Sequence, residues 1–194
     1  MSVAIVTGSG GLIGSEMSAF LHEQGMDVVG VDNDMRSYFF GDEASTRWNT
    51  DRLAAGLPRF HPQELDVRDA DGIARLFASY GPDITLVVHA AAQPSHDWAA
   101  REPITDFSIN ATGTLNMLEA TRAACPAATF AFLSTNQVYG DAPNEPPLID
   151  AATRCALDPS NPWAPPGVHR PPRVARSTAP PFGAHKPAAA APVS

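Results

Sequence analysis

The stretch that most constrains the fold lies near the N-terminus, where four apolar residues, Val3 to Val6, run into a glycine-rich turn. That turn is Thr7-Gly8-Ser9-Gly10-Gly11-Leu12-Ile13-Gly14, and from Ile13 onward the chain has apolar residues at helical spacing: Ile13, Met17, Phe20 and Leu21. This order predicts a strand, a tight turn and a helix. Backbone N–H groups and the positive end of the helix dipole would then meet at one point, which favours a bound phosphate.

The glycine turn is therefore the first candidate binding site. Gly11 would let a pyrophosphate approach the backbone, and Gly14 would let the helix pack closely on the sheet. Glycines also occur in ordinary turns, so a strand–turn–helix without a ligand is the alternative. The residues expected to contact a cofactor here are Gly8, Gly10, Gly11, Leu12, Ile13 and Gly14.

A carboxylate ends the next strand-like run, which extends from Asp27 to Val31 and leads into Asp32. An acidic residue at this position accepts hydrogen bonds from the ribose hydroxyls of an adenosine and repels a 2′-phosphate. Asp32, with Asn33 beside it, therefore predicts NAD rather than NADP as the cofactor. Arg36 lies close by and is the one feature here that would suit a 2′-phosphate.

Strands and helices are predicted to alternate through residues 3–135. We expect strands at 3–7, 27–32, 59–65, 84–92 and 129–133, and helices at 12–25, 70–80 and 103–124. Residues 33–58 suggest an irregular segment with a short helix near 45–55, and residues 93–102 a polar loop. Right-handed crossovers between such strands give a parallel sheet covered on both faces. The predicted fold class is α/β, a doubly wound Rossmann sheet of about five strands.

Further cofactor contacts are expected after the third and fourth strands. Asp66 and Val67 come where an adenine would lie in such a sheet, while Asp69 suits the N-cap of the following helix. After the buried fourth strand, three small residues would let a cofactor lie flat against the chain: Ala90, Ala91 and Ala92.

Four other features have a structural and a functional interpretation. We interpret His89 as a buried, hydrogen-bonded residue rather than a catalyst. His96 and Asp97 are next to each other in the sequence, and we interpret them as solvated loop residues rather than an acid–base pair. Asn110 interrupts a helix, so we expect it to hold a backbone group or a bound water, and we include it among the cofactor-site residues. Tyr38-Phe39-Phe40 suggests a small hydrophobic cluster, with the edge of a cofactor site as the alternative.

Composition narrows the class of protein. The net charge of −8 disfavours binding to nucleic acid or to an anionic membrane surface. Two widely separated cysteines, and an N-terminus without a basic region before an apolar core, predict a reduced, cytoplasmic protein without a secretory signal. No run of apolar residues is long enough to cross a bilayer, and we expect no metal site.

Residues 151–194 differ from the rest of the chain. Residues 1–150 carry a net charge of −12, whereas residues 151–194 carry +4 and ten of the 19 prolines. We therefore expect a dinucleotide-binding domain at 1–150 and a Pro/Arg-rich irregular tail at 151–194. We interpret that tail as the remnant of a truncated or partly frame-shifted longer gene; a natural disordered tail or a proline-rich ligand segment are the alternatives.

Several motifs occur together in a fixed order: the glycine turn, Asp32, Asp66-Val67, Asn110-Ala111-Thr112-Gly113-Thr114 and Ser134-Thr135-Asn136-Gln137-Val138-Tyr139-Gly140. Over about residues 1–150 the chain resembles the extended short-chain dehydrogenase/reductases, the NAD-dependent epimerase/dehydratase family. The stretches 91–98 and 113–120 are most similar to CDP-paratose 2-epimerase-like members. The resemblance implies NAD as cofactor, a nucleotide-sugar substrate and a homodimer formed through helices 70–80 and 103–124.

The resemblance also implies a mechanism. A carbinol carbon of the sugar is oxidised to a ketone, and the hydride is returned to the other face. A Tyr acts as general base, a Lys four residues later lowers the pKa of that Tyr, and a Ser or Thr binds the same oxygen. Thr135 matches the Ser/Thr and Lys186 the Lys, but Phe182 stands at the Tyr position and has no proton to exchange.

This departure leaves several functions open. The first is an NAD-dependent nucleotide-sugar epimerase or dehydratase that is impaired in this chain. The second is an NAD-binding module without catalytic activity, and the third is a non-functional gene fragment. The prolines around Phe182 and Lys186 also disfavour the helix on which the family carries this motif.

Overall fold

A computed structural model describes residues 2–134, 148–150 and 155–157 of the 194-residue chain. The chain divides into two compact units, one ending at Leu133 and the other beginning at Ser134. The first unit contains the whole predicted sheet. In the second, β6 (Leu148–Asp150) and β7 (Cys155–Leu157) form an antiparallel pair. A domain division at residue 150 stays a prediction.

Five parallel strands form the sheet of the first unit: β1 (Val3–Thr7), β2 (Asp27–Asp32), β3 (Phe60–Glu64), β4 (Ile84–His89) and β5 (Thr129–Phe132). Their order is β3-β2-β1-β4-β5, so the direction of winding reverses between β1 and β4. Thr7, the last residue of β1, pairs with Val31 on one side and with His89 on the other. The predicted α/β doubly wound fold is confirmed.

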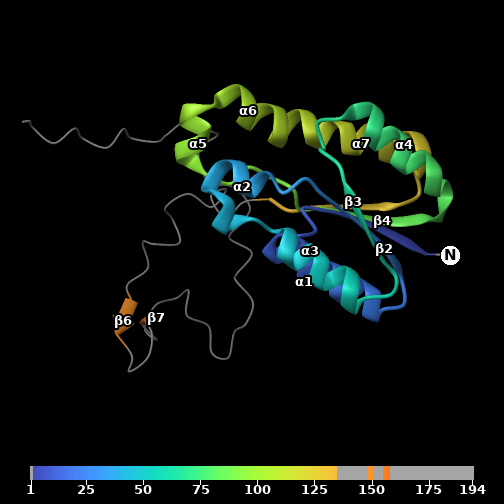
Figure 1. The fold of residues 1–194 in the computed structure, drawn as a ribbon, viewed down its shortest axis with the longest axis horizontal. Coiled ribbons are helices and arrows are strands. Elements are labelled where there is room, and N and C mark those ends of the chain that lie inside the picture. Colours follow the sequence, from blue (N-terminus) through green and yellow to red (C-terminus); the bar gives the residue numbers. More distant parts are fainter. Residues whose placement is uncertain (1, 135–147, 151–154, 158–194) are drawn as a thin grey trace, which may run out of the picture. The chain divides into compact units, whose positions relative to one another are not determined.

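Helices cover both faces of the sheet, as Figure 1 shows. One face carries α1 (Leu12–Glu23) and α3 (Arg47–Gly56). The other carries α4 (Ala70–Tyr80) and a continuous run made of α6 (Pro103–Phe107), a π-helical turn (Ser108–Thr112) and α7 (Gly113–Ala124). In α4 the side chain of Asp69 caps the N-terminus by accepting from Gly72 N at 2.9 Å.

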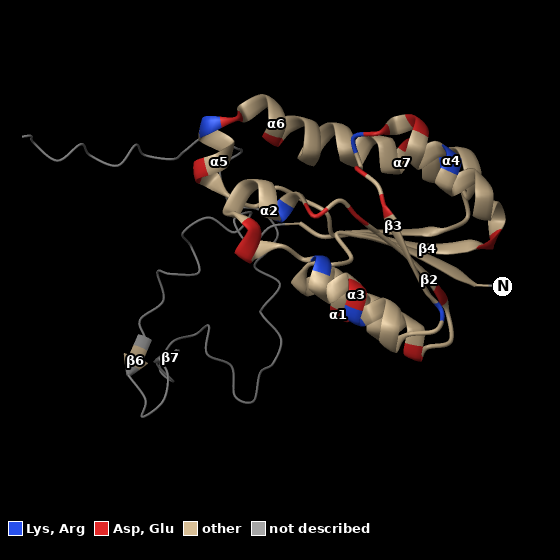
Figure 2. Cartoon of the chain, in the orientation of Figure 1, with Lys and Arg blue, Asp and Glu red and all other residues tan. Residues whose placement is uncertain are grey.

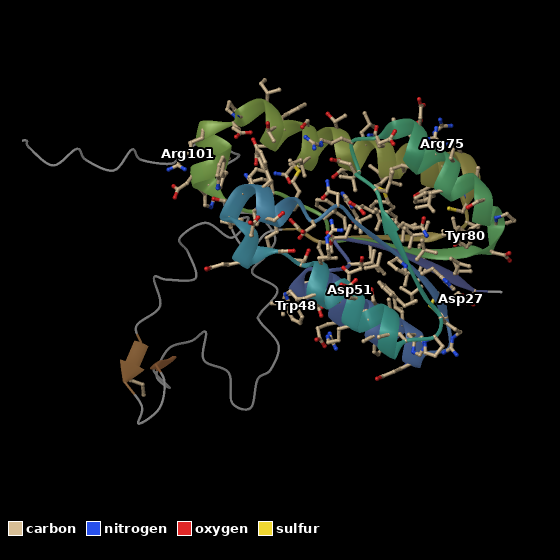
Figure 3. The ribbon with its side chains drawn as sticks, viewed as in Figure 1. Asp27, Trp48, Asp51, Arg75, Tyr80 and Arg101 are labelled. Atoms are coloured by element: carbon tan, nitrogen blue, oxygen red, sulfur yellow. The ribbon has the colours of Figure 1, made fainter. Side chains whose placement is uncertain are left out.

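The alternation of side chains along β1 divides the core into two clusters. Val3 and Ile5 pack with Ile73 and Phe77 of α4, whereas Ala4 and Val6 face the side of α1 and α3. All five residues of β1 are buried, as expected for a central parallel strand. On α4 the exposed Arg75 lies on the outer face, and Tyr80 packs against the core (Figure 3).

Two short helices were not expected. α2 (Met35–Phe40) lies in the segment predicted to be irregular, and α5 (His96–Arg101) replaces the polar loop predicted at 93–102. Each has only six residues, too few to show a helical period. Tertiary contacts hold them instead, because Phe39 and Trp98 pack edge to face at 5.3 Å. A 3₁₀ turn, Asp42–Ala44, also follows α2.

Charged residues are distributed over the described helices without a concentration of one sign (Figure 2). Acidic and basic positions are mixed along the described helices, and the view in Figure 2 shows no basic stripe on them. None of the helices in the described part of the chain has the length and apolarity that crossing a membrane requires.

Candidate functional site

A cleft opens at the carboxyl edge of the sheet, where β1, β2 and β4 end. This is the usual position of a ligand in an open α/β sheet, beside the point where the strand order reverses. Nine of the residues expected to contact a cofactor line it: Gly8, Gly11, Asp32, Asn33, Asp66, Val67, Ala90, Ala91 and Ala92.

The glycine turn enters this cleft from β1. Gly8 has a φ of +66°, which lets the chain turn sharply, and its N–H donates to Val31 O at 2.8 Å. Gly11 is the N-cap residue of α1 and has no side chain to cap the first turn, and no acidic residue lies in that turn. The Leu12 and Ile13 side chains are exposed. An uncapped helix N-terminus without a competing carboxylate suits the phosphates of a dinucleotide.

The Asp32 carboxylate lies between the turn and the next loop. One oxygen accepts from Gly10 N at 2.9 Å, and the other accepts from Asp34 N at 2.8 Å. The carbonyl of Gly10 accepts from the Asn49 side chain of α3, also at 2.9 Å. Gly10 is thus fixed on both sides, and each Asp32 oxygen keeps acceptor capacity for a ligand hydroxyl.

Asp34 organises the loop beyond Asp32. Its φ of +53° is rare for a residue with a side chain, and its carboxylate accepts from Ser45 Oγ and Thr46 N, each at 2.7 Å. Burial opposes the charge, but these hydrogen bonds and the nearby Arg47 outweigh it and lower the pKa of Asp34. The result is a fixed path that brings Thr46 to the cleft.

Asp66 forms the other polar edge of the cleft. It accepts from Asn33 Nδ2 at 2.8 Å and from Arg68 Nη2 at 2.6 Å. Partial burial raises the pKa of this carboxyl, but the Arg68 and Asn33 hydrogen bonds lower it by more, so Asp66 is held as the anion. The two predicted site residues Asn33 and Asp66 therefore contact each other directly.

Aromatic residues of α2 form one wall. Phe39 and Phe40 line the cleft, and the Arg36 guanidinium lies over the Phe40 ring, 5.2 Å from its centroid. Tyr38 donates to Glu102 Oε1 at 2.9 Å, which ties α2 to the residue that follows α5. Tyr38-Phe39-Phe40 therefore belongs both to a local cluster and to the edge of the cleft.

The alanine segment, Ala90 to Ala92, is held by hydrogen bonds at both of its ends. Thr7 Oγ1 accepts from Ala90 N at 3.1 Å and from Ala91 N at 3.0 Å. Asn110 accepts from Gln93 N at 2.9 Å and donates to Gln93 O at 3.1 Å. Asn110 holds a backbone group, one of its two expected roles, but it does not itself line the cleft.

Not every predicted residue reaches the cleft. Gly10, Leu12, Ile13 and Gly14 belong to the turn and first turn of α1 but are not among the residues that line it. Thr135, Phe182 and Lys186 lie outside the described residues. His96 and Asp97 begin α5, where Ser95 caps the helix, and neither lines the cleft. Within the described ranges, no three or more His, Cys, Asp or Glu side chains are grouped to hold a metal ion.

Half of the cleft lining was not anticipated as cofactor contacts. These residues come mainly from α2, from the start of α3 and from the ends of β2 and the alanine segment: Val31, Met35, Arg36, Phe39, Phe40, Thr46, Leu65, Pro94 and Ile109. Only the aromatic run at 38–40 and the basic Arg36 gave a signal in the sequence.

The fold and the cleft define a doubly wound dinucleotide-binding domain. Its glycine turn, the acid at the end of β2 and the uncapped α1 fit a dinucleotide together, because they offer N–H groups to phosphates and a carboxylate to a ribose. The chain belongs to the NAD dependent epimerase/dehydratase family, whose model matches residues 4–165.

Individual relatives agree with this assignment. The chain is 34% identical to the CDP-paratose 2-epimerase of Salmonella typhi over 137 residues, and 31% identical to the UDP-glucose 4-epimerase of Mycolicibacterium smegmatis over 160 residues. These matches cover 71% and 82% of this chain, but only 38% and 46% of the relatives. The chain therefore spans less than half the length of these proteins.

Solved structures show the same correspondence. The UDP-glucose-4-epimerase of Stenotrophomonas maltophila, crystallised with NAD and formylated UDP-arabinopyranose, matches with a TM-score of 0.58 at 28% identity. That match covers 72% of this chain and 38% of the other. The UDP-glucose 4-epimerase of Thermotoga maritima, crystallised with UDP-glucose, also gives 0.58, at 29% identity. The expectation of an NAD-dependent family is confirmed.

Proposed function

We propose that this chain carries the NAD-binding part of a nucleotide-sugar epimerase or dehydratase. The observation that supports this most directly is the Asp32 carboxylate, which faces the cleft and is hydrogen-bonded to the glycine turn at Gly10 N. One side chain thus links the expected ribose site to the expected phosphate site. The CDP-paratose, UDP-glucose and dTDP-glucose enzymes among the relatives support a nucleotide-linked sugar as substrate.

Different residues of this chain would bind different parts of NAD. The N-terminus of α1 would take the pyrophosphate, Asp32 the adenosine ribose, and the segment from Asp66 to Val67 the adenine. Ala90 to Ala92 would present backbone without bulky side chains along the cofactor. When bound, NAD supplies reversible oxidation of a sugar carbinol.

Thr135 is proposed to hydrogen-bond the reacting sugar oxygen, and Lys186 to hold the nicotinamide ribose. Phe182 at the family's Tyr position favours a second function, an NAD-binding module without turnover, because a phenyl ring cannot accept a proton. A third possibility, a non-functional fragment, requires that the cleft bind no cofactor.

Titration of the 194-residue chain with NAD while its thermal unfolding is followed separates these functions. A ligand that binds only the folded state at 100 times its Kd stabilises it by about 2.7 kcal/mol, so Tm should rise with NAD concentration. No rise at millimolar NAD would contradict NAD binding by this chain. If NAD binds, incubation with CDP-, UDP- and dTDP-sugars followed by chromatography of the products distinguishes turnover from binding alone.

Replacing Asp32 by Ala should weaken NAD binding at least tenfold, because hydrogen bonds to a charged group contribute about 1.5–3 kcal/mol each. The same change should weaken NADP binding less, since it removes the carboxylate that repels the 2′-phosphate. Isothermal titration with both cofactors gives the NAD/NADP affinity ratio, which is expected to fall.

The affinity ratio is the informative quantity in that experiment. Loss of the Gly10 and Asp34 hydrogen bonds could disturb the loop, but this would weaken both cofactors alike. Asp32→Asn is the matched control, because it keeps an oxygen acceptor and removes the charge. An unchanged ratio in both variants would contradict a ribose site at Asp32.

A further inference from the structure

A connected chain of hydrogen bonds runs from the alanine segment beside the cleft to the helices on one face of the sheet. Ala90 N and Ala91 N donate to Thr7 Oγ1, which lies 2.7 Å from His89 Nδ1. On the other side of the ring, His89 Nε2 lies 3.0 Å from Thr114 Oγ1, which donates to Asn110 O at 2.6 Å. The imidazole of His89 is the link between β1 and α7.

The direction of each bond in this chain follows from proton counting. The single hydroxyl proton of Thr114 goes to the Asn110 carbonyl, so Thr114 Oγ1 can only accept from His89. His89 Nε2 must therefore carry a proton. Thr7 Oγ1 already accepts from two backbone N–H groups, so its own proton goes to His89 Nδ1, which must be unprotonated. The hydrogen bonds thus specify one tautomer, the Nε2–H form.

The same surroundings keep the ring uncharged. His89 is 1% exposed, and the rings of Phe130 and Phe132 lie beside it. Burial lowers its pKa to about 4. A protonated Nδ1 would also face the Thr7 hydroxyl, whose acceptor positions are taken by Ala90 and Ala91.

We propose that His89 is a positioning residue of the cofactor cleft. As the neutral Nε2–H tautomer it donates to Thr114 of α7 and accepts from Thr7. Thr7 is thereby held where its hydroxyl oxygen fixes the backbone of Ala90 and Ala91. The inference rests on the proposed function, since the cleft is taken to bind NAD. It adds a role for a buried side chain that does not itself line the cleft.

The fit between the alanine segment and the glycine turn explains why this placement matters. A Cβ added to Gly8 would lie 2.9 Å from Ala91 N and 3.0 Å from Ala90 O. The two backbones are therefore close together, and a shift of Ala90 or Ala91 toward the turn would push against Gly8. The turn that is proposed to hold the pyrophosphate depends in this way on the hydrogen bonds through His89.

The test changes Thr114, which lies at the end of the hydrogen-bond chain that is away from the cleft. Thr114→Val keeps the shape of the side chain but leaves His89 Nε2–H without an acceptor, and Thr114→Ser keeps the hydroxyl. We expect the Kd for NAD to rise about fivefold in Thr114→Val, because Thr7 and the backbone that it binds are no longer held in place through His89. In Thr114→Ser the Kd should stay near the wild-type value.

A spectroscopic measurement decides the tautomer without any cofactor. In long-range ¹H–¹⁵N spectra the pattern of ring couplings identifies the protonated nitrogen, and wild type and Thr114→Ser should show His89 as the Nε2–H form. An Nδ1–H form or an imidazolium at neutral pH in the wild type would overturn the inference. So would an unchanged NAD affinity in Thr114→Val.

The two proposals fail in distinguishable ways. If the wild-type chain binds no NAD, the proposed function is overturned and the positioning role falls with it. If wild type and Thr114→Val bind NAD equally well, only the positioning role is overturned. If Thr114→Val does not fold, the wild-type spectrum still decides whether the required tautomer is present.

Discussion

Gly14→Ala is expected to destabilise the domain by about 3 kcal/mol or more, at the upper end of the cost of overpacking a core. Gly14 is buried in the first turn of α1, where a Cβ would overlap the carbonyl oxygen of Gly8 and lie 2.9 Å from Ser9 Cα. These are backbone atoms, so no side-chain rotation can relieve the overlap. Either α1 must move away from β1 or the glycine turn must change its path.

Urea unfolding followed by circular dichroism measures this effect, and Gly56→Ala is the matched control. Gly56 ends α3, and a Cβ there would meet nothing within 4 Å. Alanine should therefore stabilise this position by up to about 1 kcal/mol through its better helix propensity. If Gly14→Ala unfolds within about 1 kcal/mol of wild type, the close packing of α1 on the glycine turn is contradicted.

The elements with a strong periodic signal were predicted correctly from the sequence. β1 and β4 are mostly apolar, and α4 carries Ile73 and Phe77 four residues apart, so burial on the sheet leaves a clear pattern. α2 and α5 had no such pattern. They are stabilised by contacts between Phe39 and Trp98, residues far apart in the sequence, and no local propensity reports such a pair.

The candidate site divides in a similar way. Asp32 and Asp66 could be predicted because the first ends a strand and the second comes shortly after one, and parallel strands bring their carboxyl ends to one edge. Thr46 could not, because its place at the cleft depends on the left-handed conformation of Asp34 and on that carboxylate accepting from Ser45 and Thr46. The direction of the hydrogen bonds through His89 likewise depends on contacts between β1, β4 and α7, which cannot be inferred from any one segment of the sequence.

Stability of the domain should fall by about 3 kcal/mol between pH 6.5 and pH 4 because of His89 alone. The pKa of His89 is about 4 in the folded protein and has an ordinary value of 6.5. Between these values the unfolded chain binds a proton that the folded chain does not. The contribution of neutral His89 is therefore fully present above pH 6.5 and is lost as the pH falls toward 4.

The pH range of this loss of stability distinguishes His89 from two hydrogen-bonded carboxylates, those of Asp34 and Asp66. Burial opposes the charge of Asp34 and Asp66, but their hydrogen bonds lower the pKa of both carboxyls, so the stabilisation from these carboxylates is lost at lower pH than that from His89. Urea unfolding at half-unit steps from pH 7 to pH 4 gives the slope for the wild type and for His89→Gln. The other five histidines are common to both chains and cancel in the comparison.

The His89→Gln variant should be less stable at pH 7 because the Thr7 and Thr114 hydroxyls lose their shared partner, yet its stability should fall less steeply as the pH is lowered. Equal slopes in the two chains would show that His89 is not held neutral, and the hydrogen bonds that join β1 to α7 through an Nε2–H imidazole would then have to be reassigned.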